Sequence, residues 1–291
     1  MKKIFYIFYI AIFTVSLCAC NESKNIVIDN EGIVLYKDKQ YEKALPLLEQ
    51  AAKKGDPLAP FYLGMMYDEG TGVKKDDQKS FAWFENAAKN GNEDAFFVVA
   101  TRYFYGKGVK KDYKRALEWF KKIELEGKNT NKTVYFFLGT MYYNGMGTFK
   151  DASEAAKWFE RSAELGDETA QGMLSMQFYT GEGVLKDKKA ATYWAEKAAQ
   201  KGDDIGEFIM GMLCQYDDSS NMDKAIFWYE KSAKQRNPAA QYQLANIYKN
   251  GEGVTKDLKK AKYYYEQAAK SQSEIPVKAF LEFEAKQKKQ N

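Results

Sequence analysis

The hydrophobic residues of this chain recur at helical spacing, and the same arrangement returns several times along it. Three of the copies are Leu63, Gly64 and Tyr67, then Leu138, Gly139 and Tyr142, and then Leu244, Ala245 and Tyr248. Offsets of one and three residues place the three side chains of a copy on one face of a helix. The small central residue leaves room for a neighbouring helix to approach closely.

A second hydrophobic pattern follows each of these segments and predicts a second helix. Its anchor positions are Ser80, Ala116, Ala155, Ala191, Ala225 and Ala261. Three residues after the anchors stand Trp83, Trp119, Trp158, Trp194, Trp228 and Tyr264, so all five tryptophans share one phase. We expect these rings to pack in the core between helical hairpins, because a single hairpin cannot bury both of its faces. The alternative interpretation is an aromatic box that holds a ligand.

A glycine-rich segment lies between the two helices of a unit. It reads GTGVKKD at residues 70–76 and returns as GKGVKKD, GMGTFKD, GEGVLKD and GEGVTKD, at spacings of 36, 39, 36 and 70 residues. The first glycine is expected to end one helix, and the final aspartate is expected to cap the next. A nucleotide-binding loop is not expected, because a helix precedes the glycines and the chain lacks a Walker sequence. The pattern predicts no nucleotide and no other cofactor.

The remaining turns follow the same logic. The gap of 70 residues spans two units, and its middle holds a degenerate copy, YDDSSNMD, that ends at Asp223. Glycines such as Gly91 are expected to end the second helices, and Arg236 takes that place in the sixth unit. The expected caps of the helices that follow are Asp56, Asn92, Asp167, Asp203 and Asn237.

The composition excludes several kinds of catalytic site, metal site and partner. The 291 residues include no histidine, which removes Ser-His-Asp and Cys-His catalysis and the commonest metal ligand. No metal site is expected. The net charge is +4, or +2 without Lys2 and Lys3 (4 − 2), so the bulk charge predicts no polyanion partner and no nucleic acid. Hydrophobic residues make up 45% of the chain and supply a core.

The N-terminus has the layout of a secretory signal, with Lys2 and Lys3 before an apolar run that reaches Ala19. The sequence LCAC ends at Cys20 and resembles the lipobox of bacterial lipoproteins, in which the signal is cleaved before a cysteine that then carries lipid. That resemblance implies a signal over residues 1–19, a lipidated Cys20 and a short linker over 20–27. Asn21 favours the outer membrane, because aspartate there marks retention in the inner membrane. An uncleaved anchor helix is the alternative.

The units that run from LGMMYDEGTGVKKD to AWFENAAKNG resemble Sel1-like repeats, which are relatives of tetratricopeptide repeats with a longer loop. The resemblance covers about residues 57–270, and a shorter, more tetratricopeptide-like unit precedes it at 28–55. It implies an all-α, right-handed α-solenoid of about seven helix-turn-helix units over residues 28–270. Residues 271–291 are expected to form a capping helix and basic tail, in which Phe280, Leu281 and Phe283 cover the last hairpin.

The family resemblance implies a protein-binding adaptor or regulator. One extracytoplasmic branch with paired cysteines is linked to β-lactam hydrolysis, but this chain lacks such pairs and lacks the S-x-x-K, S-D-N and K-T-G motifs. No catalytic residue is assigned, and a hydrolase of β-lactams or wall fragments is kept as the alternative function. Periplasmic lipoproteins with such repeats resemble immunity proteins that neutralise a secreted effector, and an envelope adaptor is the other form of the leading hypothesis.

Two surfaces are candidates for binding. Late in the first helices, aromatic residues gather in the middle units, namely Phe104, Tyr105, Tyr143 and Tyr179. We expect them on the concave side as anchors for a protein partner, with ordinary partial burial as the alternative. The second surface is a basic ridge along the loops, made of Lys74, Lys75, Lys110, Lys111, Lys186 and Lys256. It would meet acidic protein, lipid headgroups or wall polymer, or is simply a solvated edge.

Cys214 is expected to be a buried, inert thiol, because it takes the place that Tyr67, Tyr142 and Tyr248 hold in other units. The alternative is a redox-active or cross-linking thiol.

Overall fold

A computed structural model describes residues 31–126, 131–216 and 221–290, and every element within these ranges is an α-helix. The N-terminal signal, Cys20 and the linker lie outside the described residues. The helices of the first four units are α2 (Glu31–Lys37), α3 (Tyr41–Lys53), α4 (Ala59–Glu69), α5 (Asp77–Lys89), α6 (Glu93–Tyr105), α7 (Tyr113–Glu126), α8 (Lys132–Asn144) and α9 (Ala152–Glu164). The others are α10 (Glu168–Thr180), α11 (Lys188–Gln200), α12 (Asp204–Tyr216), α13 (Met222–Lys234), α14 (Pro238–Asn250), α15 (Leu258–Ala269) and α16 (Glu274–Gln290).

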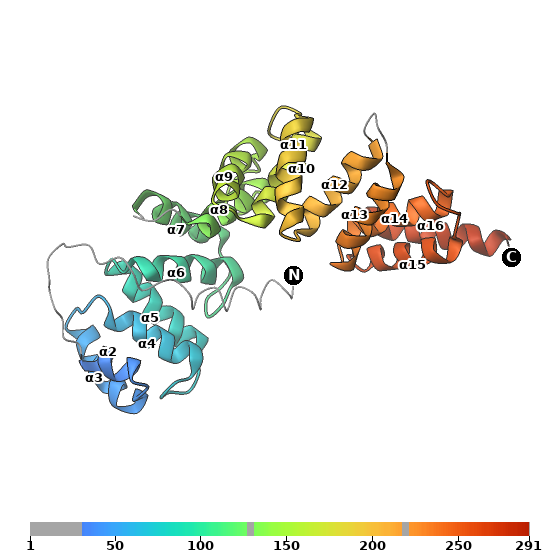
Figure 1. Ribbon diagram of the computed structural model, residues 1–291. Helices are drawn as coiled ribbons and strands as arrows, with labels where there is room; N and C mark the ends of the chain where they lie inside the picture. Colours follow the sequence, from blue (N-terminus) through green and yellow to red (C-terminus); the bar gives the residue numbers. More distant parts are fainter. Residues whose placement is uncertain (1–30, 127–130, 217–220, 291) are drawn as a thin grey trace.

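The helices pair into seven antiparallel hairpins that follow one another in a curved row (Figure 1). Each hairpin packs mainly on the one before it and the one after it, from α2 and α3 at one end to α14 and α15 at the other. Such a row buries a continuous core that no hairpin could form alone. The expectation of an all-α solenoid of about seven units is confirmed.

The helix boundaries lie where the turn residues place them. Asp76, Asp151, Asp187 and Asp257 each accept backbone N–H groups at the start of a second helix, and the first loop glycines end the preceding helices in left-handed conformation. The sixth unit differs from the expectation. Its cap is Asn221, which accepts from Lys224, and Asp223 lies inside the first turn of α13. The helix begins two residues earlier than expected because Asn221, itself a preferred capping residue, takes this role in place of Asp223.

In three hairpins a glycine of the first helix, Gly64, Gly139 or Gly211, is in direct contact with an aromatic ring of the second helix. A methyl group at Gly139 would lie 2.6 Å from Cδ1 of Phe159, and one at Gly211 would lie 2.5 Å from Cδ1 of Tyr229. The predicted close approach of the two helices is therefore present in these hairpins.

The tryptophans were expected to be buried in the core, but the structure places them at its margin. They are half-buried, and the fully buried ring is the next residue, as at Phe120, Phe159 and Tyr229. The residue four places after the anchor lies on the anchor's face, whereas the residue three places after it lies to one side. The tryptophan rings pack there on the first helix of their own hairpin, as in the contact of Trp119 in α7 with Phe96 in α6, whose ring centres are 5.4 Å apart.

The second glycine of each loop seats that loop on the unit before it. A methyl group at Gly108 would overlap the carbonyl oxygen of Asp77 at the start of α5, and one at Gly147 would overlap that of Tyr113 at the start of α7. The loops therefore join neighbouring hairpins as well as the two helices of their own hairpin.

The helix α16 packs against α15 at the end of the row. Phe283 is buried with its ring centre 5.3 Å from that of Tyr265, and Phe280 is half-buried beside it. Leu281, expected to cover the last hairpin as well, is 61% exposed, because it lies on the opposite side of α16.

Replacing Arg236 by glycine is expected to stabilise the protein. Arg236 has a φ of 70°, in the left-handed region that Gly91, Gly166 and Gly202 occupy at equivalent positions. Relief of this strain, partly offset by the greater entropy of the unfolded glycine chain, should add about 0.5–1 kcal/mol to the free energy of unfolding. Urea unfolding followed by circular dichroism measures it, with Gly202→Ala as a control of opposite sign. A less stable Arg236→Gly variant would contradict this assignment.

Candidate functional site

The first two predicted anchors lie at the junction of the third and fourth units. The ring of Phe104 is half-buried against Phe137 and Tyr113, with centres 5.1 Å and 5.3 Å away. Tyr105 is 41% exposed and contacts Phe104 edge-on at 5.0 Å. Burial raises the pKa of the Tyr105 hydroxyl. Phe104 is thus mainly a packing residue, and Tyr105 presents the accessible part of this pair.

Tyr143 is held by the loop of the next unit. Its hydroxyl donates to Oε2 of Glu182 at 2.8 Å, and Lys150 lies over its ring at 5.2 Å. Burial, together with the hydrogen bond to Glu182, raises the pKa of Tyr143 to about 12. The Tyr143 hydroxyl is therefore already hydrogen-bonded within the protein and its ring is partly covered.

These contacts follow a rule of the repeat. The residue between the two loop glycines contacts the residue four places after the small core position of the preceding unit. Instances are Lys107 with Asp68, Glu182 with Tyr143, and Glu252 with Gln215, the last at 3.4 Å. The surface expected to form an open aromatic groove is in this way covered, unit by unit, by the following loop.

The sixth unit breaks the rule, because the segment between α12 and α13 is two residues shorter and has no glycine. In other units the capping residue donates its N–H to a carbonyl nine positions earlier, as Asp187 does to Phe178. In the sixth unit Asn221 donates to Cys214, seven positions earlier, at 2.8 Å. In other units a loop glycine packs on the start of the second helix of the preceding unit. Because the sixth unit has no loop glycine, none takes this place at the start of α11.

A cavity of about 340 Å³ lies at that place. Its lining residues are Phe178, Tyr179, Lys186, Lys188, Met212, Leu213 and Tyr216. Tyr179 is half-buried, Tyr216 is 60% exposed, and Lys186 and Lys188 stand exposed at the rim. Burial and the neighbouring Tyr216 raise the pKa of Tyr179, while the Lys188 ammonium opposes the rise. The result is an apolar pocket with a cationic rim.

Tyr179 is the predicted anchor that the structure places in a pocket. Sequence reasoning missed Met212 and Tyr216, and the signal that could have found them is the glycine-free segment after α12. It also missed a row of half-exposed rings on the outer faces of α11, α13 and α15, formed by Tyr193, Phe227 and Tyr263, each one residue before the tryptophan phase.

Cys214 is only partly buried, at the margin of the core cluster that contains Tyr229. The expectation of a buried thiol is wrong in degree: Tyr67 and Tyr142, which hold the equivalent place, are likewise only half-buried, so this position is not fully enclosed in those units either.

The six lysines predicted to form a ridge are all exposed and lie on the loops at one edge of the solenoid. Lys111 lies 5.6 Å over the ring of Tyr113.

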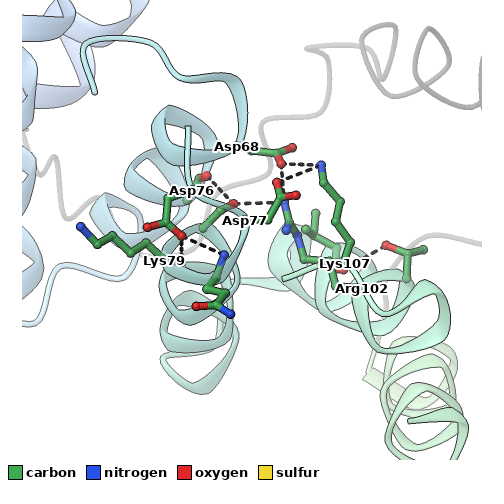
Figure 2. A network of polar contacts seen from close by, with 11 residues as sticks. Asp68, Asp76, Asp77, Lys79, Arg102 and Lys107 are labelled. Atoms are coloured by element: carbon green, nitrogen blue, oxygen red, sulfur yellow. Dashed lines mark hydrogen bonds and ion pairs between the residues drawn. The ribbon is translucent and has the colours of Figure 1, made fainter. Parts of the chain in front are cut away.

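A partly buried ionic network joins the second and third units (Figure 2). Nη2 of Arg102, a residue that is 4% exposed, lies 2.8 Å from Oδ1 of Asp68 and donates to Oγ of Ser80 at 3.0 Å. Lys107 also binds Asp68. Burial opposes ionisation of Asp68, but these two cations outweigh it and lower the pKa of its carboxyl. The signal in the sequence is an arginine where Met66 and Met141 stand in the adjacent units.

Neither the raised carboxyl pKa values nor the buried serines form a catalytic arrangement. Burial raises the pKa of Asp203 to about 7, yet its Oδ1 accepts the N–H of Gly206 at 2.8 Å as a helix cap. Ser80 and Ser162 donate to main-chain carbonyls at 2.8 Å. A serine nucleophile needs a neighbouring base, and the partner of Ser80 is a guanidinium that only donates.

In the part of the chain that the structure describes, none of the helices has the length and apolarity needed to cross a bilayer. Within the same ranges, no three cysteine, aspartate or glutamate residues gather closely enough to hold a metal ion.

Comparison with known proteins identifies the repeat. The Sel1 repeat family matches residues 31–56, 57–92, 97–126, 134–167, 169–203, 205–237 and 238–273. The first unit, expected to be more tetratricopeptide-like, is thus matched as well. No curated protein matches the chain.

Solved structures of similar proteins agree with this. A Sel1 repeat protein from Oxalobacter formigenes is 31% identical with a TM-score of 0.65, over 82% of this chain and 95% of that one. A protective antigen of uropathogenic Escherichia coli with an SLR fold is 34% identical with a TM-score of 0.65, over 82% of this chain, which spans 51% of that protein. An immunity protein from Pseudomonas aeruginosa, 20% identical over 71% of this chain and 80% of that one, has a TM-score of 0.43 and is too distant to bear on function. With seven matched units and relatives above 30% identity, this chain belongs to the Sel1 repeat family.

Proposed function

We propose that this chain is a non-enzymatic, membrane-tethered protein of the cell envelope that binds another protein through the pocket around Tyr179. The lipobox-like LCAC sequence supports tethering through Cys20 on the periplasmic side, with Asn21 favouring the outer membrane. The repeat family supports a binding role, since a solenoid offers an extended surface and few enclosed sites. The partner is a secreted effector that the chain neutralises or an envelope protein that it positions.

The observation that carries the proposal is the pocket itself. Its floor of Phe178, Met212 and Leu213 is apolar, and Lys186 and Lys188 stand at the rim. A volume of about 340 Å³ suits one or two side chains of a protein segment rather than a large ligand. The matching chemistry is an apolar anchor residue flanked by carboxylates.

Photo-crosslinking in cells tests this proposal. A benzophenone amino acid in place of Tyr216 should give one discrete crosslinked species, to be identified by mass spectrometry. The same group in place of Tyr263, which is similarly exposed on α15, serves as the matched control. Equal crosslinking at both positions, or none at Tyr216, would remove the pocket as the binding site.

The partner so identified is then purified for a binding measurement. Tyr179→Ala with Met212→Ala should weaken its affinity by about 2 kcal/mol or more, roughly thirtyfold, as for anchor residues of other interfaces. Tyr193→Ala on α11, outside the pocket, should leave affinity unchanged. A lipase or wall hydrolase as partner would establish the immunity role, and an envelope protein would establish the adaptor role.

A further inference from the structure

The tips of the five glycine-rich loops, which we call the loop edge, have an unusual composition in the middle of the row. At the fifth position of these loops stand Lys74, Lys110, Phe149, Leu185 and Thr255. The sixth position is lysine in every one of them. Phe149 is 94% exposed and Leu185 is 91% exposed, so neither side chain packs on the protein to any extent.

The two apolar tips project from neighbouring, well-held loops. Nζ of Lys150 binds Oε1 of Glu182 at 2.9 Å, and Oγ of Ser153 donates to the carbonyl of Gly183 at 2.7 Å, so the loops of the fourth and fifth units are joined side by side. Each loop is closed by a main-chain hydrogen bond, from Asp151 to Tyr142 at 2.9 Å and from Asp187 to Phe178 at 3.1 Å. The exposed tips are therefore fixed in place rather than parts of loose segments.

Charge surrounds the apolar pair. Lys110 and Lys111 precede it along the edge, Lys186 follows Leu185 directly, and Lys256 lies farther along. All four are exposed. Long lysine side chains can keep their ammonium groups at the level of lipid headgroups while shorter apolar tips enter the boundary of the acyl chains.

We propose that the loop edge docks on an anionic lipid surface, with Phe149 and Leu185 inserted and the flanking lysines bound to headgroups. A bilayer accepts projecting apolar side chains anywhere, whereas a protein partner would need two matching pockets at the right separation. The lysines complement anionic headgroups, and apolar insertion combined with basic residues is the usual combination of signals for peripheral binding. This inference does not rest on the partner proposed for the pocket, although Lys186 takes part in both surfaces.

The test uses the full chain reconstituted with vesicles, so that any N-terminal tether acts equally in every sample. An environment-sensitive fluorescent amino acid replaces Phe149 or Leu185, one at a time. The matched control replaces Leu125, which is 80% exposed but lies at the last turn of α7, the end of the helix far from its loop. The vesicles contain phosphatidylcholine with roughly one third of the anionic lipid phosphatidylglycerol, or phosphatidylcholine alone, and carry headgroup spin-labelled lipid as quencher.

With anionic vesicles, quenching at positions 149 and 185 should be at least about twofold stronger than at 125, and salt should weaken it by screening the lysines. With phosphatidylcholine alone the difference should largely disappear. Equal quenching at all three positions, or none at 149 and 185, would overturn the proposal. So would a change in fluorescence that depends on protein concentration without vesicles, since it would show a second copy covering the tips.

Discussion

The variant Gly108→Ala is expected to lose about 3 kcal/mol of folding free energy, and Gly91→Ala only about 1–2 kcal/mol. Both glycines have left-handed backbone, with φ of 70° and 84°, so an alanine side chain is strained at either position. Only at Gly108 would the added methyl group also overlap the carbonyl of Asp77 in the preceding hairpin, whereas at Gly91 it meets nothing within 4 Å.

Backbone strain destabilises both variants, but only Gly108→Ala also disturbs an interface between two hairpins. Moving the loop away from α5 weakens the contact between the second and third hairpins, and a solenoid depends on such nearest-neighbour contacts. Urea unfolding by circular dichroism measures both variants, and hydrogen exchange at the amide of Gln78 reports on the seat directly. Equal losses for Gly108→Ala and Gly91→Ala would show that the loop seat contributes nothing.

The variant Arg102→Met is expected to lose about 3–5 kcal/mol, although methionine stands at the equivalent positions of α4 and α8. Removal of the guanidinium takes from Asp68, whose side chain is 18% exposed, its buried cationic partner, while the contact with Lys107 remains. It also removes the contact with the Phe84 ring, over which the guanidinium carbon lies at 5.0 Å.

Replacing the whole network should be far less costly than breaking it. The next junction along the row has Phe104, Met141 and Met146 where this one has Asp68, Arg102 and Lys107. The triple variant with Asp68→Phe, Arg102→Met and Lys107→Met should therefore recover to within about 1–2 kcal/mol of the natural protein. A triple variant no more stable than Arg102→Met would contradict this account.

The pH dependence supplies a second criterion for the same network. Because the cations lower the pKa of Asp68, its contribution is fully present above the ordinary aspartate pKa and is lost as pH falls through the lower folded value. The natural protein should lose stability below about pH 4 more steeply than the triple variant. Parallel acid unfolding curves would show that Asp68 is not part of a stabilising pair.

The position of a residue in the repeat does not by itself predict how exposed its side chain is, as the candidate anchors show. Phe104, Tyr143 and Tyr179 occupy equivalent places, yet the first packs on Phe137, the second binds Glu182, and the third lines a pocket. Their surroundings depend on residues of the following unit, 33 to 39 positions away in the sequence. Periodicity identified the position correctly but could not tell which copy remains open.

Local chemistry determined what the sequence alone could establish about this protein: an all-α repeat array, its helix boundaries and most of its caps. Glycine conformation, Asp and Asn caps and apolar spacing act within a few residues, so they can be read directly from the chain. The tertiary structure decided which rings are buried, that Asp68 pairs with Arg102, and which of the equivalent anchors, Tyr179, lines a pocket. These outcomes depend on contacts between side chains of neighbouring units, which lie more than 30 positions apart in the sequence.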